Sequence, residues 1–196
     1  MKEAIIIFIR NPELGKVKTR LAAGVGAETA LDIYKQLLLH TMQVTDASNA
    51  DKFVFYHEQI MQNDIWNKKG FFKNLQAGIN LGEKMKRAFS TVFSEGYSKV
   101  IIIGSDCLEL NSAFIKEAFA GLEQKDTVIG PAKDGGYYLL GMKINLPFLF
   151  ENIAWSTDTV FNDTVFSMKQ HNLSTALLPV LTDVDTEADW QESKKL

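Results

Sequence analysis

The chain is poor in cysteine, histidine and proline. Its 196 residues include 1 cysteine, 3 histidines and 4 prolines. Because Cys107 is the single cysteine, no internal disulfide can form, and a reducing compartment is expected. The histidines, His40, His57 and His171, are scattered, so the sequence has no zinc site of the usual ligand spacing.

Long apolar runs and an excess of positive charge are also missing. The N-terminal apolar run, 4–9, ends at Arg10 and is far shorter than the roughly 20 residues of a membrane-spanning helix. No small-residue cleavage site follows it, as a signal peptide would require. The net charge of -3 gives no basic field for nucleic acid or an anionic membrane. We therefore predict a cytoplasmic protein with no nucleic-acid partner and no membrane insertion.

The composition is that of an ordinary globular protein with a core of its own. Hydrophobic residues make up 46% and charged residues 23% of the chain. We find no repeat, low-complexity stretch or linker, and the length suits one domain. We therefore predict a single domain over residues 1–196.

Aliphatic runs alternate with amphipathic segments along the whole chain. This alternation predicts an α/β protein with a parallel sheet and right-handed crossovers. Strands are predicted at 4–9, 52–57, 71–76, 99–104, 126–130, 137–142 and 175–178, and helices at 27–42, 81–93, 114–122 and 158–170. An acidic tail ends the chain.

Ligands of parallel sheets bind outside the carboxyl ends of the strands. Four polar segments follow predicted strands: 10–20, 76–82, 105–110 and the turn around Asp134. We therefore expect these four segments to converge on one site.

The first of these segments holds four cations in an acidic chain, Arg10, Lys16, Lys18 and Arg20. Such side chains neutralise phosphate oxygens with charge-assisted hydrogen bonds. The spacing is not that of a Walker loop. Its place after the first strand favours a phosphate site, and a solvated basic loop is the alternative.

The segment 76–82 joins a strand to a helix. Asn80 is a plausible N-cap, with Glu83 as its capping-box partner. The other interpretation, which includes Gly82, is that the helix N-terminus and its backbone amides meet a base edge or a phosphate.

Asp106 lies at the mouth of a buried strand, where a carboxylate can hold Mg²⁺ or Mn²⁺ between nucleotide phosphates. The alternative is a helix cap, but Asn111 and Ser112 are better placed for that role. Neighbouring Cys107 has no histidine positioned to activate it, so we expect a packing residue.

Asp134, Gly135 and Gly136 form a turn between two predicted strands. A hairpin turn is the simplest interpretation, but the paired glycines also favour a close approach to a ligand.

Two further segments follow toward the C-terminus. Ser156 or Thr157 is the expected N-cap of the next helix. Asp183 and Asp185 alternate along an extended segment and should share one face, which suits a divalent cation. A solvated tail is the alternative.

Taken in order, these motifs resemble a bacterial family. They are FxRNPxxGxxKTRL (Phe8 to Leu21), LGEKM (Leu81 to Met85), GSD (Gly104 to Asp106), GPAKDGGYYLLG (Gly130 to Gly141), WST (Trp155 to Thr157) and DVDTxxD (Asp183 to Asp189). The family is that of uncharacterised glycosyltransferase-like proteins of the GT-A, nucleotide-diphospho-sugar transferase superfamily, a domain of unknown function. The chain also resembles molybdopterin and phospholactate guanylyltransferases.

The resemblance implies a Rossmann-like GT-A fold, a three-layer α/β/α sandwich with a mostly parallel mixed sheet. It implies phosphate binding by Lys16, Lys18 and Arg20, and a metal held by Asp106 and Asp185. Asp134 to Gly136 would line the transfer site. The chain departs from the family pattern at Asn80, Lys84 and Leu108, where the last position lacks the second carboxylate of a DxD motif.

We therefore predict a glycosyltransferase-like enzyme that depends on Mg²⁺ or Mn²⁺ and uses a nucleotide-diphospho-sugar donor. The alternatives are a nucleotidyltransferase that moves NMP from NTP to a phosphorylated acceptor and a non-catalytic nucleotide-binding module. Predicted catalytic residues are Asp134 and Lys18, predicted metal ligands are Asp106 and Asp185, and predicted substrate-binding residues are Arg10, Lys16, Lys18, Arg20, Gly82, Gly135 and Gly136. The base, sugar, acceptor and oligomeric state stay open, with a homodimer as one option.

Overall fold

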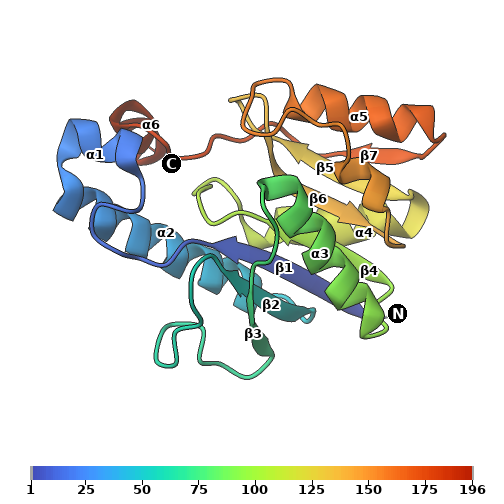
Figure 1. Ribbon diagram of the computed structural model, residues 1–196, viewed down its shortest axis with the longest axis horizontal. Helices are drawn as coiled ribbons and strands as arrows, with labels where there is room; N and C mark the ends of the chain where they lie inside the picture. The colour runs from blue at the N-terminus through green and yellow to red at the C-terminus, as the bar shows by residue number, and fades with distance from the viewer. Residues whose placement is uncertain (1, 196) are drawn as a thin grey trace.

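A seven-stranded mixed sheet forms the centre of the computed structural model, which describes residues 2–195 (Figure 1). The strand order is β3-β2-β1-β4-β6-β5-β7. Strand β6 runs antiparallel to its neighbours β4 and β5, whereas β1 is parallel to β2 and β4, β2 to β3, and β5 to β7. The strands are β1 (Glu3–Ile9), β2 (Asp51–Tyr56), β3 (Phe71–Leu75), β4 (Lys99–Ile103), β5 (Thr127–Pro131), β6 (Tyr137–Met142) and β7 (Thr175–Leu177). The predicted mostly parallel mixed sheet is confirmed.

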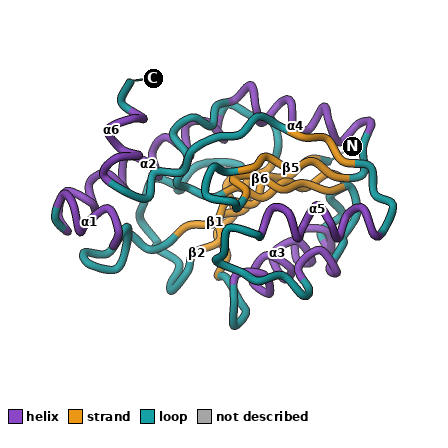
Figure 2. The backbone as a smooth tube through the Cα atoms, turned by 90° about the horizontal axis from the view of Figure 1, so that it is seen from above, coloured by secondary structure: helices purple, strands orange, loops and turns teal. Residues whose placement is uncertain are grey.

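Helices cover both faces of the sheet, which gives three layers (Figure 2). On one face lie α2 (Ala27–Asp46) and α4 (Ser112–Gln124), and on the other lie α3 (Leu81–Ser94), the 3-10 helix η1 (Pro147–Phe150) and α5 (Val160–Gln170). Two short helices complete the fold, α1 (Thr19–Val25) and α6 (Glu187–Ser193). These come from opposite ends of the chain, yet they are in contact. The predicted α/β/α sandwich is confirmed.

The place of strand β1 inside the sheet explains why the N-terminal run is apolar throughout. Ile5 and Ile7 pack toward α2 and α4, whereas Ala4 and Ile6 pack toward α3. All four are completely buried. Because each face is covered by helices, none of these four positions favours a polar side chain. Each buried isoleucine contributes roughly 1.5–3 kcal/mol relative to an exposed one.

The helix caps agree in part with those predicted from the sequence. Asn111 caps α4 as predicted, because its side chain accepts hydrogen bonds from the amides of Ala113 and Phe114. Asn80 caps α3 by accepting from the Glu83 amide at 2.9 Å. The Glu83 carboxylate accepts from the amide of Ile79 rather than that of Asn80, so the capping box is displaced by one residue.

Three local predictions were wrong or missing. Helix α5 begins at Val160, and its N-cap is Thr159 rather than Ser156 or Thr157. Ser156 has a φ of 67°, outside the extended range usual for an N-cap. The short helices α1 and α6 were not predicted. Each has only 7 residues, and a helix of this length is stable only when tertiary contacts support it.

Among residues 2–195, no helix combines the length and the apolar character needed to cross a membrane.

Candidate active site

A cleft with two adjoining lobes opens at the carboxyl edge of β1, β2, β3 and β4. The lobes have volumes of about 600 and 550 Å³. The cationic lobe is lined by Arg10, Lys16, Lys18, Arg20, Lys84, Asp106 and Asp185, among others. The acidic lobe is lined by Asp134, Asp158, Asp183 and Arg20, with several aromatic rings. Arg20 and Gly104 border both. Residues from all four segments that the sequence singled out therefore meet in one cleft.

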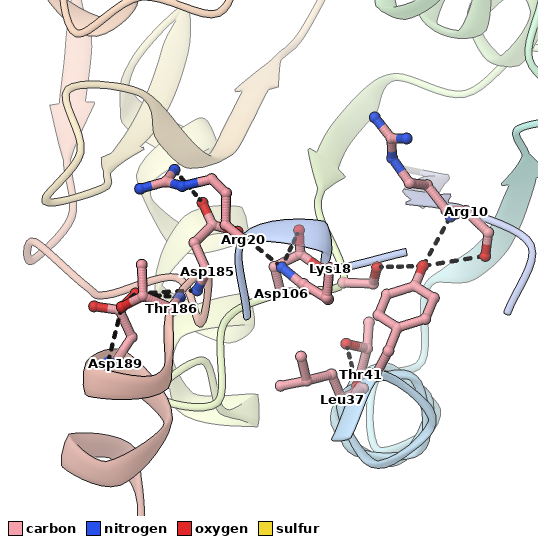
Figure 3. A network of polar contacts seen from close by, with 11 residues as sticks. Arg10, Lys18, Arg20, Leu37, Thr41, Asp106, Asp185, Thr186 and Asp189 are labelled. Atoms are coloured by element: carbon pink, nitrogen blue, oxygen red, sulfur yellow. Dashed lines mark hydrogen bonds and ion pairs between the residues drawn. The ribbon is translucent and has the colours of Figure 1, made fainter. Parts of the chain in front are cut away.

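Lys18 lies between two carboxylates in the cationic lobe (Figure 3). Its amine is 3.0 Å from Asp106 Oδ2 and 3.0 Å from Asp185 Oδ1. The side chain is only 6% exposed. Burial alone would lower the pKa of Lys18, but the two carboxylates outweigh it and raise the pKa above its ordinary value. Lys18 also has a φ of 48°, a left-handed backbone that turns the chain into α1.

The C-terminal segment delivers Asp185 to this position. The Val184 amide donates a 2.8 Å hydrogen bond to the carbonyl oxygen of Asp106, which fixes the segment across the end of β4. Asp189 closes a capping box with Thr186 and also accepts from the Asp185 amide at 3.1 Å. The Arg20 guanidinium lies 3.6 Å from Asp185 Oδ2. Of the carboxylates in the tail, Asp185 faces the cationic lobe and Asp189 is structural.

Tyr34 on α2 holds the start of the basic loop. Its hydroxyl accepts from the Arg10 amide at 2.8 Å and donates to the Arg10 carbonyl oxygen at 3.1 Å. The Ser105 hydroxyl lies 3.4 Å away. Burial and the nearby Asp106 raise the pKa of Tyr34, so the hydroxyl keeps its proton. No sequence pattern indicates this role directly, since Tyr34 fits the apolar face of its helix.

The far end of the cationic lobe contains a polar chain in which Gln76 belongs to a predicted segment, whereas His57 and Lys84 were not predicted as site residues. Lys84 Nζ lies 3.2 Å from His57 Nδ1. Gln76 Nε2 donates to the carbonyl oxygens of Ile9 and Phe55 at 3.0 and 2.9 Å. His57 and Gln76 directly follow β2 and β3, so the strand-end rule was the available signal.

Lys16 and Arg10 occupy the outer part of the lobe. Lys16 is exposed and forms ion pairs with Glu13 at 2.7 Å and Glu58 at 3.2 Å. Hydrogen bonds to these two glutamates raise the pKa of Lys16. Arg10 and Lys84 take part in no ion pair within residues 2–195, which leaves both charges available for an anion.

The acidic lobe holds Asp134 at its rim and Asp183 deeper inside. Asp134 Oδ1 accepts a 2.9 Å hydrogen bond from the Gly136 amide. Burial, together with the charges of Asp106 and Asp134, raises the pKa of Asp183 to about 7. Asp183 and Asp185 line different lobes instead of sharing one, because the extended segment crosses the boundary between them.

Two of the predicted substrate-binding glycines have a packing role. Gly82 is buried, and a β-carbon there would overlap the indole of Trp155. Gly135 has a φ of 90°, and a β-carbon would overlap the carbonyl oxygen of Asp158. Neither residue lines a lobe, whereas Gly136 borders the acidic lobe.

Cys107 is buried beside the site, and burial raises the pKa of its thiol to about 12. Such a thiol is not a nucleophile near neutral pH, which agrees with the predicted packing role.

The donor set at Asp106 and Asp185 suits a hard divalent cation. Two carboxylate oxygens from separate segments already converge on one positive charge, the Lys18 ammonium. Carboxylate oxygens are the preferred protein ligands of Mg²⁺. In residues 2–195 no group of three or more His, Cys, Asp or Glu side chains is arranged to hold a metal ion. A cation here would therefore take its other ligands from phosphate oxygens and water.

The model of a bacterial family, described as "Uncharacterized protein conserved in bacteria (DUF2064)", matches residues 39–157. A crystal structure from Desulfovibrio desulfuricans G20, provisionally assigned as a nucleotide-diphospho-sugar transferase, superposes with a TM-score of 0.89. It shares 34% sequence identity, and the match covers 95% of this chain and 84% of that one.

Two more distant structures share the fold. The inositol-1-phosphate CTP transferase from T. maritima has a TM-score of 0.61 at 14% identity, over 99% of this chain and 94% of that one. The manganese complex of Rv0371c from Mycobacterium tuberculosis H37Rv has a TM-score of 0.61 at 10% identity, over 100% and 99% of the two chains. No curated protein matches the chain.

Proposed function

Because this chain belongs to the bacterial family DUF2064 and has a cleft with a cationic and an acidic lobe, we propose that it is a divalent-metal-dependent transferase with a nucleotide-diphospho-sugar donor. The name of the 34% identical structure supports this donor class. The proposal depends on one observation. The carboxylates of Asp106 and Asp185 both lie 3.0 Å from the ammonium group of Lys18, so they are close enough together to bind one metal ion.

The cationic lobe suits the diphosphate of the donor. Arg10 and Lys84 offer charges without an ion-pair partner in residues 2–195, and Lys18 and Arg20 flank the carboxylates. The amine of Lys18 would pass from its carboxylate partners to a phosphate oxygen when the donor binds. Charge-assisted hydrogen bonds of this kind stabilise the charge that builds on a departing diphosphate.

Asp106 and Asp185 would hold Mg²⁺ or Mn²⁺, which when bound supplies Lewis-acid neutralisation of the phosphate charge. The manganese complex of a protein with the same fold makes Mn²⁺ a reasonable first ion to test.

The acidic lobe would receive the acceptor. An acceptor hydroxyl oxygen forms the new bond to the anomeric carbon of the sugar, while the bond from that carbon to the phosphate oxygen breaks and the nucleoside diphosphate leaves. The hydroxyl proton passes to a carboxylate, for which Asp134 at the rim of the lobe is our candidate base. A carboxylate placed this way contributes typically 10²–10⁴-fold in rate.

A nucleotidyltransferase is the second candidate, and one observation favours it. The strand-end Asp106 has Leu108 where a DxD motif would supply its second carboxylate, and the C-terminal Asp185 takes that place. Such an enzyme would bind NTP and release pyrophosphate.

A thermal-shift screen of NTPs, NDPs and NDP-sugars, each with Mn²⁺, Mg²⁺ or a chelator, tests these proposals on wild type and Asp106→Ala. A ligand at 100 times its dissociation constant adds about 2.7 kcal/mol, which is several degrees for a domain of this size. We expect a metal-dependent shift with one NDP-sugar that Asp106→Ala abolishes.

The other outcomes separate the alternatives. A shift with NTP alone would favour the nucleotidyltransferase. A shift in this screen, combined with no product in a separate turnover assay with either metal, would indicate a non-catalytic module. No shift with any nucleotide would contradict a nucleotide site altogether.

A further inference from the structure

Carboxylates predominate among the charged side chains of the acidic lobe. Its lining contains three carboxyl side chains, Asp134, Asp158 and Asp183, and one cation, Arg20. None of the three carboxyls takes part in an ion pair within residues 2–195. Arg20 is already directed toward Asp185, 3.6 Å away, and its side chain is 72% exposed. Whatever the protonation state of Asp183, this side chain adds no positive charge.

One backbone amide at the start of the nearest helix is already engaged. Helix α5 begins beside the lobe, and a helix N-terminus is often an anion site. Here the Phe161 amide is bonded to the Gly135 carbonyl oxygen at 2.9 Å. Asp163 lies in the first turn of the helix and accepts a hydrogen bond from the Thr159 hydroxyl. An acidic side chain in this turn already complements the helix dipole.

Aromatic side chains form part of the remaining wall of the lobe, together with aliphatic side chains and the hydroxyl residues Ser156 and Thr157. Trp155 stacks on Phe150 with ring centroids 6.4 Å apart, and Gly82 leaves room for the indole. The hydroxyl of Tyr137 points to the sulfur of Met85, so this side chain offers its ring and not a free donor to a ligand. Flat apolar faces beside carboxylate acceptors suit a polyhydroxy or amine compound, whose O–H or N–H groups can donate to the carboxylates.

We propose that the acidic lobe selects an acceptor that is uncharged or positively charged, a polyol or an amine, and discriminates against phosphorylated acceptors. This inference rests on the proposed transferase function. It also separates the two candidate reactions, since transfer of NMP to a phosphorylated acceptor would place a second phosphate among these carboxylates. Like charges brought together at a binding site weaken binding, and here we expect a phosphorylated acceptor to bind about tenfold more weakly, or worse, than its parent compound.

Fluorescence of Trp155 reports on the lobe directly. We would subtract the signal of Trp155→Phe from that of wild type and measure quenching by iodide, an anion, and caesium, a cation. Each value is normalised to quenching of free tryptophan amide. We expect caesium to quench Trp155 more efficiently than iodide after this normalisation. The difference between the two quenchers should decrease with added salt, which screens the charges of the lobe. Equal access for iodide would overturn the proposal.

Charge reversal supplies the matched variants. Asp158→Lys puts a cation into the lobe and should reverse the preference between the two quenchers. Glu95→Lys makes the same change at the exposed C-cap of α3, the opposite end of the helix from the cleft, and should leave the preference as in wild type. An unchanged preference in Asp158→Lys would overturn the proposal.

Paired ligands test the selectivity itself. The probes are glycerol with glycerol 3-phosphate and glucosamine with glucosamine 6-phosphate, titrated against Trp155 fluorescence. The unphosphorylated member of each pair should bind more tightly in wild type. Asp158→Lys should reduce this difference in affinity between the two members. Tighter or equal binding of the phosphorylated members, or no binding by any probe, would overturn the proposal. Nucleotide binding in the thermal-shift screen is measured separately, so failure of the transferase proposal is recognised independently.

Discussion

The amine of Lys18 and the carboxylate of Asp185 lie 3.0 Å apart although 167 positions separate them in the chain. This contact joins the loop after the first strand to the C-terminal segment, and Asp106 at the end of β4 completes the group. Lys18 thus holds together the two carboxylates that we propose as metal ligands. The same geometry makes the ammonium and a divalent cation competitors for one place.

Replacing Lys18 with methionine should therefore change stability and metal binding in opposite directions. Methionine, like lysine, is unbranched at its β-carbon, so the strain of the left-handed backbone is similar in the two proteins. Without metal, the variant leaves two carboxylates facing each other and should lose about 2 kcal/mol of unfolding free energy. Mn²⁺ should bind the variant more tightly than wild type and restore much of the stability, while turnover is lost.

Urea unfolding with and without Mn²⁺ measures both effects. Equal stabilisation of wild type and Lys18→Met by Mn²⁺ would show that the ammonium and the metal do not compete.

Asp189 should matter for stability and not for metal binding. Its carboxylate accepts from the hydroxyl and the amide of Thr186 at 2.8 and 2.7 Å, which caps α6. Asp189→Ala should cost about 1 kcal/mol, the usual size of a lost cap. Thermal unfolding would show the loss, and a Mn²⁺ titration would show affinity close to that of wild type. Loss of Mn²⁺ binding in this variant would place Asp189 among the metal ligands.

The contact between Gly82 and Trp155 can be tested by a double-mutant cycle. Gly82→Ala should destabilise the protein by roughly 1–3 kcal/mol, because the new methyl group would overlap the indole ring. Trp155→Ala removes the ring, so adding Gly82→Ala to that variant should cost much less. Denaturant unfolding of the four proteins gives the coupling energy. Additive costs would mean that Gly82 is required for some other reason.

Asp126 should make stability depend on pH. Its carboxylate accepts from the Ser174 hydroxyl at 2.6 Å and the Ser174 amide at 2.9 Å, and these hydrogen bonds lower its pKa. A carboxyl whose pKa is lower in the folded state stabilises the fold above its unfolded pKa of about 3.9, and this contribution is lost as the pH falls through the folded pKa. The side chain is 46% exposed, so we expect less than about 1 kcal/mol.

The comparison of wild type with Asp126→Asn in urea checks this expectation. The difference in unfolding free energy should be larger near neutral pH than at about pH 3, below the unfolded pKa. A difference that is the same at both pH values would contradict the assigned role.

Much of the fold followed from local sequence patterns. The aliphatic run of β1 and the helical spacing of α2 are signals that burial on defined faces imposes on any such sequence. The position of the cleft could also be predicted, because the strand-end rule depends only on which segments come after strands. The predicted residues Arg10, Lys16, Lys18, Arg20, Asp106 and Asp185 all line the cationic lobe.

Features that depend on tertiary contacts could not be predicted from local sequence patterns. Whether Asp183, Asp185 or Asp189 faces the site is set by the hydrogen bond from Val184 to Asp106, which no local pattern encodes. Lys99 is another case: it is buried within β4, where its amine contacts Glu3 and Glu123, though its charge suggests an exposed strand end. The packing of Gly82 against Trp155 could not be predicted either, because the indole ring comes from a distant segment of the chain.

The most direct test of the metal and phosphate site is a titration of Mn²⁺ followed by electron paramagnetic resonance, with and without a nucleoside diphosphate. It would be run on wild type, Asp106→Asn and Asp185→Asn. The proposed site predicts that the nucleotide tightens Mn²⁺ binding in wild type and that each substitution abolishes this coupling. Coupling that survives in both variants would contradict the assignment of Asp106 and Asp185 as the residues that hold the metal.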